Sequence, residues 1–375
     1  MTRIAMDVRN NWLGGGIGQY VRRISDGLAK SYDIVGISHR GEAEGFAFPV
    51  RHSRLSQTLA ENAFLGTMSP VSYERLLGLS GVECLVFPNN AMPAFRMEAK
   101  TVAVIHDMLT IRIKDFMRKE GHGEGWFRKC EARYRRVAER ADVLCTVSEF
   151  TKRDVMETFG VPEDRFAIVP PGVDYRLFAD ADAAKDAEVK ARLALPDKYI
   201  LYVGSPREYK NVHGLIRAFA SLPESLRREW HLVISHGIAW FGPLVSELGI
   251  GDRLRFLGGV SEGDKASIYR LAKALGFVSY FEGFGMPALE AMAAGVPVLA
   301  SNRASVPEIV GSAGLEVDPA DGAAVAAGME RLMTDEDLRS RLSAAGRERA
   351  KAFTWQESVR KMSDAIQKAL KGGRR

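Results

Sequence analysis

Short apolar segments alternate with helix-like segments along this chain, and this alternation favours parallel β-sheets. The first series of strand-like segments lies at residues 4–8, 33–38, 84–87, 101–105, 143–147 and 166–169. A second series lies at residues 199–203, 231–235, 254–257, 275–279 and 296–300. Strands that alternate with helices pair in parallel, because a helix carries the chain back across the sheet. Two such series predict an α/β protein with two parallel-sheet domains.

A polar, alanine-rich stretch at residues 175–196 separates the two series, and we expect the domain junction there. The predicted domains are therefore residues 1–175 and 176–354. A length of 375 residues suits two domains of about 150 residues each. Another helix is expected at 55–78, and a last amphipathic helix at 355–371.

The composition narrows the class of protein. No apolar run approaches the ~18 residues that a membrane span needs, and the chain opens without a signal-like apolar segment. The three cysteines show no metal-ligand spacing, so we expect a reduced, cytoplasmic setting.

Residues 275–301 predict a strand, a glycine-rich loop, a helix and a second strand. Glu282 follows the first strand, Pro287 suits a first helical turn, and Glu290 lies inside the helix. A glycine loop that leads into a helix presents free backbone N–H groups and a positive dipole end. This unit therefore predicts an anion site bracketed by two carboxylates.

A second cluster follows the strand at 199–203 and contains Arg207, Glu208 and Lys210. Because it follows a strand of the same sheet, it is expected at the same edge as Glu282. Two cations and a helix N-terminus could hold a diphosphate without a metal. The alternative for this cluster is a surface turn in which Glu208 pairs with a cation.

The glycine-rich loop at residues 10–18 precedes a helix in the first domain. It does not fit the dinucleotide pattern, because Val21 stands where a third glycine is needed. The loop predicts either a wall of a binding cleft, with Gly15 and Gly16, or a plain tight turn. His106 and Asp107 end another strand and are candidate polar contacts, although such a pair is commonly structural.

No metal site is predicted. Asp-x-Asp pairs occur at 180–182 and 335–337, but neither follows a strand, where metal-dependent transferases use them. No Gly-x-Ser-x-Gly nucleophile motif is present either.

Residues 112–140 carry ten basic and five acidic side chains, an excess that equals the net charge of +5. This segment predicts a basic patch for phosphates of a lipid surface, a lipid-linked substrate or a nucleic acid. The alternative is a solvated helix face with interspersed acids.

Taken together, these residues resemble the retaining glycosyltransferases of family 4. The similar segments are GGGIGQY at 14–20, VIHDM at 104–108, TVSEFTKRD at 146–154, VPPGVD at 169–174, YVGSPREYKN at 202–211, RFLGGV at 255–260, EGFGMPALEAMAAGVPVLAS at 282–301 and SVPEIVG at 305–311. The resemblance implies the GT-B fold, in which two Rossmann-like domains face across a cleft. The helix at 355–371 would then pack back onto the first domain.

The resemblance also implies residue roles. Glu282 would lie beside the donor sugar, and Glu290 would bind the ribose of the nucleotide. Lys210 and Arg207 would neutralise the diphosphate, although Tyr209 stands where relatives commonly have a basic residue. The remaining implied roles belong to His106 at the donor sugar, Gly15 and Gly16 at the diphosphate and acceptor, Phe284, Gly285 and Met286 at the sugar and phosphates, and Val260 at the base.

The predicted function is thus the transfer of a hexose, expected to be mannose from GDP-mannose, to a glycan acceptor. The resemblance is to enzymes of bacterial surface polysaccharides or lipopolysaccharide, and implies retention of configuration without a metal or other cofactor. A lipid-linked acceptor and peripheral contact with an anionic membrane are expected, and no specific nucleic acid. Two alternatives stay open: a nucleotide-sugar epimerase that needs no acceptor, and a basic nucleotide or nucleic-acid binding protein, whose binding would weaken with salt.

Overall fold

The computed structural model describes residues 1–9, 15–38, 45–52 and 71–372, and the chain forms two compact α/β units. The first unit comprises residues 1–172 together with 355–375, and the second comprises residues 173–354. The chain therefore leaves the first unit three residues before the expected boundary and returns to it at Trp355. Most of the expected helix at 55–78 lies outside the described residues, and the described part contains only α4 (Tyr73–Leu76).

The first unit contains a parallel sheet of seven strands in the order β3-β2-β1-β4-β5-β6-β7. The strands are β1 (Arg3–Asp7), β2 (Asp33–Ser38), β3 (Val50–His52), β4 (Cys84–Phe87), β5 (Lys100–Ile105), β6 (Val143–Thr146) and β7 (Phe166–Ile168). Its longer helices are α1 (Gly16–Leu28), α7 (Glu124–Arg140), α8 (Glu149–Phe159) and α19 (Trp355–Lys371), with the short α5 (Leu109–Arg112) and α6 (Lys114–Lys119) before α7. The middle strands are apolar on both faces, as expected for a sheet that helices cover.

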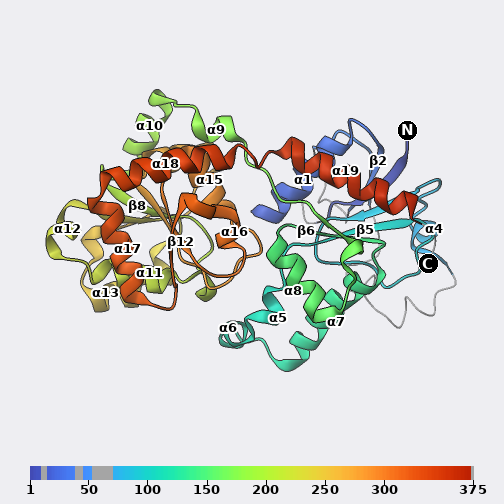
Figure 1. Ribbon diagram of the computed structural model, residues 1–375, viewed down its shortest axis with the longest axis horizontal. Helices are drawn as coiled ribbons and strands as arrows, with labels where there is room; N and C mark the ends of the chain where they lie inside the picture. The colour runs from blue at the N-terminus through green and yellow to red at the C-terminus, as the bar shows by residue number, and fades with distance from the viewer. Residues whose placement is uncertain (10–14, 39–44, 53–70, 373–375) are drawn as a thin grey trace. The chain divides into compact units, whose positions relative to one another are not determined.

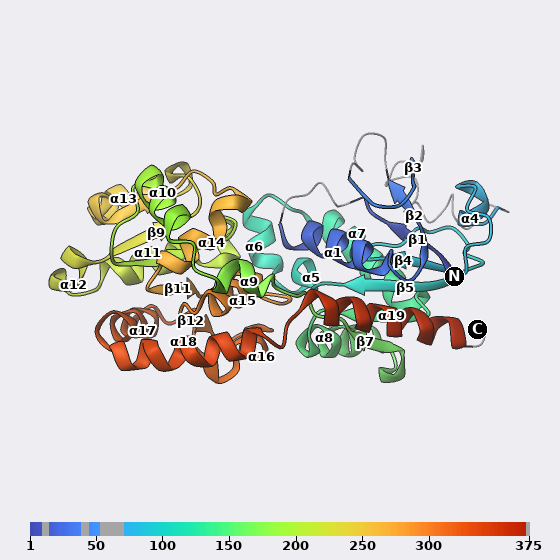
Figure 2. The ribbon, with the colours of Figure 1, turned by 90° about the horizontal axis from the view of Figure 1, so that it is seen from above.

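The last helix of the chain, α19, belongs to the first unit and packs against α1 and strands β4 to β7. Figures 1 and 2 both show this helix, drawn in red, beside the blue α1. A Cβ atom on Gly27 would come within 2.3 Å of Val359, so the glycine in α1 permits the close approach. The Tyr32 and Ser363 hydroxyls, 2.8 Å apart, add a polar contact.

The second unit contains a parallel sheet of six strands in the order β10-β9-β8-β11-β12-β13. Its strands are β8 (Tyr199–Tyr202), β9 (His231–Ile234), β10 (Leu254–Phe256), β11 (Ala274–Phe277), β12 (Val298–Ser301) and β13 (Gly314–Val317). Its helices are α9 (Tyr175–Ala179), α10 (Ala183–Leu193), α11 (Val212–Ala220), α12 (Glu224–Glu229), α13 (Gly242–Leu248), α14 (Glu262–Leu271), α15 (Met286–Ala294), α16 (Val306–Val310), α17 (Gly322–Thr334) and α18 (Glu336–Ala350). Parallel sheets in two α/β units confirm the predicted fold class.

The expectation that residues 175–196 form a junction is corrected by the structure. This segment forms α9 and α10, which pack on α15 and α14 within the second unit. Alanine, lysine and glutamate are strong helix formers, and Asp182 caps α10 by accepting a hydrogen bond from the Lys185 N–H at 3.0 Å. The polar composition therefore reflects a half-exposed helix.

Candidate active site

The carboxyl edge of the second sheet carries the predicted residues of that unit. Strand β8 has β9 and β10 on one side and β11 to β13 on the other, so the strand order reverses between β8 and β11. Ligands of open parallel sheets bind at such a point, outside the carboxyl ends of the strands. Lys210 lies in the loop after β8, and Glu282 lies in the loop after β11.

The structure brings Lys210 and Glu282 into direct contact. The Lys210 Nζ atom lies 2.7 and 2.8 Å from the two carboxylate oxygens of Glu282. The side chains are only 15% and 10% exposed, so the pair is largely shielded from solvent. The Tyr280 N–H donates to the Tyr209 carbonyl at 2.8 Å and ties the two loops together. A cation and a carboxylate are thus held side by side where the strand order reverses.

Asn211 and Ser305 fix these loops. Asn211 adopts a left-handed conformation, with φ of 58°, and its Nδ2 atom donates to the Pro319 carbonyl at 2.8 Å. Ser305 donates to the carbonyl oxygens of Glu282 and Phe284, with distances of 2.9 and 3.0 Å. Both side chains are buried. They hold the backbone on either side of the ion pair.

Helix α15 begins immediately after this loop. Gly285 precedes it with φ of 117°, a conformation that favours glycine, and Pro287 occupies its first turn. Gly285 has no side chain that could cap the helix, and in the first turn the Ala288 N–H donates to the Gly285 carbonyl at 3.0 Å. The start of this helix therefore presents the Met286 N–H and a positive dipole end, which suit an anion. Phe284 is buried against Phe353, whereas Met286 is partly exposed.

Glu290 lies in the second turn of α15, where its side chain is 2% exposed. Lys265 pairs with its Oε1 atom, and the Tyr269 hydroxyl donates to its Oε2 atom at 2.9 Å. Burial raises the pKa of the Glu290 carboxyl, and the Lys265 charge acts in the opposite direction. Glu290 is therefore held by two donors of α14.

The other predicted residues of the second unit lie on loops at the same sheet edge. Arg207 is exposed and starts the turn Glu208–Lys210. Val260 ends the loop after β10, in which Gly258 and Gly259 have φ of 72° and 131°. Because glycine has no side chain, Gly258 and Gly259 leave this part of the edge uncovered.

The remaining predicted residues belong to the first unit. Gly15 has φ of 115° and precedes α1, which begins at Gly16, whereas Gly14 lies outside the described residues. His106 follows β5 and is buried, with its Nε2 atom 2.8 Å from the Pro88 carbonyl and its ring edge-on to Tyr20. Because a carbonyl only accepts, Nε2 carries the proton. Burial lowers the pKa of His106 to about 4, so the ring is neutral at pH 7.

Our sequence reasoning missed Ser305, Asn211, Lys265 and Tyr269. Lys265 and Tyr269 are four residues apart on α14, so they share one face of it. That spacing is the one signal that could have indicated a pair directed at a common partner.

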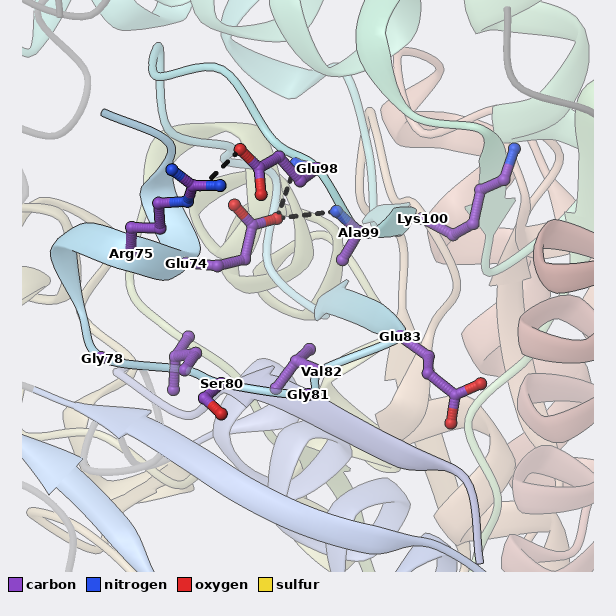
Figure 3. A pocket seen from close by; sticks show the side chains of 11 residues that line it. Glu74, Arg75, Gly78, Ser80, Gly81, Val82, Glu83, Glu98, Ala99 and Lys100 are labelled. Atoms are coloured by element: carbon purple, nitrogen blue, oxygen red, sulfur yellow. Dashed lines mark hydrogen bonds and ion pairs between the residues drawn. The ribbon is translucent and has the colours of Figure 1, made fainter. Parts of the chain in front are cut away.

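A cavity of about 610 Å³ lies elsewhere, in the first unit (Figure 3). It is found where β4 and β5 begin, at the opposite end of these strands from His106. Three carboxylates and two cations line it: Glu74, Glu83, Glu98, Arg75 and Lys100. A surplus of negative charge is unsuited to a diphosphate, so this cavity is not the anion site predicted from the sequence.

The basic segment at 112–140 contains the last residue of α5, together with α6 and α7, and many of its cations are engaged within the unit. Arg140 donates to the carbonyl groups of Pro93, Ala94 and Phe95 at 2.6 to 3.1 Å. Arg118 pairs with Asp115 and Glu124, and other pairs join Arg112 to Asp154 and Arg135 to Glu131. Arg128 and Lys129 on α7 are exposed.

The described residues form neither a cluster of metal ligands nor a membrane-spanning helix. Within them, no three His, Cys, Asp or Glu side chains gather as a metal site would require. No helix formed by these residues combines the length and the apolar character needed to cross a bilayer. Asp182 and Asp335, from the two Asp-x-Asp pairs, cap α10 and α18.

Comparison with known proteins relates both halves of the chain to sugar transferases. Residues 14–177 match the family described as Glycosyltransferase Family 4, and residues 185–349 match the Glycosyl transferases group 1. The O-antigen chain mannosyltransferase B of Escherichia coli is 33% identical over 72% of this chain and 70% of its own length. A serotype-specific mannosyltransferase of the same organism, WbdA, is 28% identical over 76% of this chain. The matched part is only 35% of the length of WbdA.

Solved structures share the fold. The lipopolysaccharide glycosyltransferase WaaG has a TM-score of 0.76 at 21% identity, with 99% of this chain and 100% of WaaG covered. HepE of Anabaena, solved with UDP and glucose, has a TM-score of 0.76 at 16% identity, with 98% and 100% covered.

Proposed function

We propose that this chain, which belongs to glycosyltransferase family 4 and has the GT-B fold, transfers mannose from GDP-mannose to a glycan acceptor in surface-polysaccharide synthesis. Its activity as a glycosyltransferase follows from the family. The names of two relatives, an O-antigen chain mannosyltransferase and a serotype-specific mannosyltransferase, support mannose as the sugar and an O-antigen-like glycan as the acceptor. The base and the sugar of the donor are parts of the proposal.

The observation that carries the proposal is the shielded pair of Lys210 and Glu282 at the carboxyl edge, beside the start of α15. Transfer of a glycosyl group develops negative charge on the leaving diphosphate and positive charge on the sugar ring. Lys210 and the first turn of α15 suit the diphosphate, and Arg207 would add a second cation. Glu282 suits the positive anomeric carbon. In low-dielectric surroundings such preorganised charges stabilise a transition state strongly.

We further propose a retaining transfer on one face of the sugar, without a metal. The bond from the anomeric carbon to the diphosphate oxygen breaks, and the acceptor oxygen bonds to that carbon from the same side. The acceptor proton passes to the departing diphosphate oxygen. The cations of this chain, rather than a metal ion, neutralise the leaving group in this proposal.

The other site residues keep the roles that the resemblance implies. Glu290 binds the ribose, Val260 borders the base, and Phe284, Gly285 and Met286 hold the sugar and phosphates. Gly15, Gly16 and His106 of the first unit are assigned to the reaction by resemblance alone. A neutral His106 suits a hydrogen bond to a sugar hydroxyl better than it suits neutralisation of a phosphate.

We propose that the acceptor is a lipid-linked or lipopolysaccharide glycan at the cytoplasmic face of the cell membrane. The exposed Arg128 and Lys129 of α7 would give a weak, reversible contact with anionic lipids.

A panel of nucleotide sugars tests the donor by thermal unfolding. A ligand at 100 times its dissociation constant adds about 2.7 kcal/mol of stability, which a melting curve detects. We expect GDP-mannose to raise the melting temperature more than UDP-glucose, UDP-galactose or ADP-glucose. A larger shift with a UDP-sugar would contradict the donor, and no shift with any of them would contradict nucleotide-sugar binding.

A further inference from the structure

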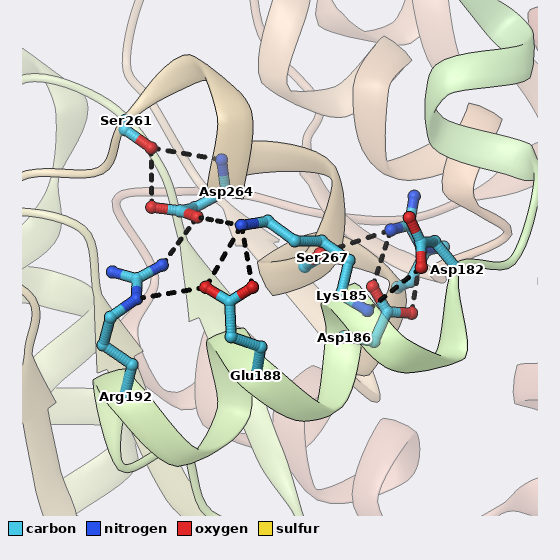
Figure 4. A network of polar contacts seen from close by, with 9 residues as sticks. Asp182, Lys185, Asp186, Glu188, Arg192, Ser261, Asp264 and Ser267 are labelled. Atoms are coloured by element: carbon cyan, nitrogen blue, oxygen red, sulfur yellow. Dashed lines mark hydrogen bonds and ion pairs between the residues drawn. The ribbon is translucent and has the colours of Figure 1, made fainter.

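Helix α14 is fixed to the unit by the face opposite to the one that reaches Glu290. Asp264 and Ser267 turn toward α10, as Figure 4 shows, and Arg270 also reaches that helix. Ser261 holds Asp264 in place by donating to its carboxylate at 2.6 Å. Asp264 pairs with Arg192 at 2.7 Å, and Arg270 pairs with Asp186 at 2.6 and 3.0 Å. Because several pairs act together, they set the position of α14 more firmly than one exposed pair could.

Lys265 and Tyr269 emerge from another face of this helix, one turn apart, and together occupy both oxygens of Glu290. The two donors differ in exposure. Tyr269 is fully buried and packs edge-on against Phe178 of α9 at 5.7 Å. The Lys265 side chain is 21% exposed. A ligand that arrives from solvent can therefore reach Glu290 on the lysine side, whereas the tyrosine side is sealed.

We propose that Tyr269 and Lys265 are positioning residues for Glu290. Lys265 gives up its contact with Oε1 of Glu290 to the ribose, whereas Tyr269 keeps its contact with Oε2. This inference rests on the proposed function, because it takes Glu290 to be the ribose ligand. Before nucleotide binds, Lys265 keeps a buried carboxylate ionised and satisfied. After binding, the ribose hydroxyls donate to Oε1, and Tyr269 alone fixes the rotamer through Oε2.

The pH dependence follows from the groups around Glu290. Those that act on its carboxyl are Lys265, Tyr269 and Glu262, all on α14. Burial raises the pKa of Glu290, and the lysine charge lowers it. Without Lys265 the carboxyl stays protonated to a higher pH, and a protonated carboxyl is a poorer acceptor for two ribose hydroxyls. Loss of the lysine should therefore move ribose recognition to higher pH.

The test measures binding of GDP and 2′-deoxy-GDP by titration calorimetry from pH 5.5 to 8.5, with UDP and 2′-deoxy-UDP in parallel. For each base, the ratio of the affinity for the ribonucleotide to the affinity for its 2′-deoxy form isolates the ribose contact from base and phosphate contacts. Tyr269→Phe should reduce this ratio roughly tenfold or more, the usual effect of a hydrogen bond to a charged group. The matched control is Tyr199→Phe, since the Tyr199 hydroxyl is also buried but donates to the Ile268 carbonyl. It should leave the ratio unchanged.

Lys265→Met supplies a second test at a partly exposed position, which keeps the inference testable if Tyr269→Phe does not fold. The pH at which the ribose preference is half its maximum should rise by about one unit or more. Lys198→Met, which removes an exposed pair with Glu229, is the control and should not move it. Above the new midpoint, the variant should bind GDP at least as tightly as the wild type, because the competing lysine is gone.

The outcomes separate this inference from the proposed function. If the wild type prefers the ribonucleotide but Tyr269→Phe acts like Tyr199→Phe, or Lys265→Met leaves the midpoint unchanged, the positioning role is wrong and the ribose contact stands. If the wild type binds GDP as tightly as 2′-deoxy-GDP, and UDP as tightly as 2′-deoxy-UDP, Glu290 does not recognise the ribose. The inference then fails together with that part of the proposed function.

Discussion

At the scale of single residues, the contact between Lys210 and Glu282 sets the chemistry that the second unit can offer. The charges are shielded and neutralise each other in the free protein. Removing one partner of a buried pair leaves the other without compensation, so each side chain also contributes to stability. An incoming diphosphate would share Lys210 with Glu282, since an ammonium group has three donors.

Lys210→Ala should lower the turnover of sugar transfer at least about a hundredfold, as expected when a preorganised charge is removed from a transition state. Some stability should also be lost, because Glu282 is left without its partner at a shielded position. Circular dichroism and initial rates with saturating donor measure the two effects separately. Lys198→Ala, which removes an exposed cation from the same unit, should change neither by much. Turnover near that of the wild type in a folded Lys210→Ala variant would refute the phosphate role.

His106 should make folding stability depend on pH. Its pKa in the folded state is about 4, below the ordinary value of 6.5. The unfolded chain therefore binds the proton more readily between these values, and the contribution of His106 is complete above pH 6.5 and lost as the pH falls toward 4. This amounts to about 3 kcal/mol. In urea unfolding, the free energy of unfolding of His106→Gln should fall less than that of the wild type between pH 6.5 and 4. If the free energy of unfolding falls equally with pH in both proteins, the imidazole is not buried as a neutral group.

At the scale of elements, the sequence predicted the strands of both sheets except β3 and β13, together with the loops at their carboxyl ends and the helix after Gly285, because each depends on local patterns. The contacts of Glu290 with Lys265 and Tyr269 could not be predicted, since they depend on how α14 and α15 pack. The same holds for Arg140, whose partners lie 45 to 47 residues earlier in the chain. Composition misled us at residues 175–196, where a polar helix resembled a linker.

The proposed membrane contact depends on exposed basic residues of helix α7. Reversal of the exposed charges with Arg128→Glu and Lys129→Glu should reduce binding to vesicles that contain anionic lipid at low salt, because each basic residue near such a surface contributes about 1 kcal/mol. Flotation with phosphatidylglycerol vesicles measures the bound fraction. Charge reversal at Lys198 and Arg228 of the second unit, both exposed, serves as the control. If the wild-type protein does not bind these vesicles, the proposed membrane contact is wrong.

At the scale of the whole molecule, the two sheets share a design in which strand order reverses beside the first strand of each. In the first unit the reversal lies between β1 and β4, and the loop after β1 leads to Gly15 and Gly16. In the second it lies between β8 and β11, where Lys210 and Glu282 meet. Helix α19 returns to the first unit, so the chain passes between the units twice. The predicted GT-B class is confirmed at this scale by the fold of its structural relatives.

The anomeric configuration of the first product decides whether the proposed transfer of mannose retains configuration. GDP-mannose carries the sugar in the α configuration. Nuclear magnetic resonance of the product formed from GDP-mannose and a mannosyl acceptor should show the α-mannoside, and none should form when acceptor is omitted. A β-mannoside would contradict retention. A product that forms from the donor alone, by change of the sugar rather than its transfer, would contradict the transferase mechanism itself.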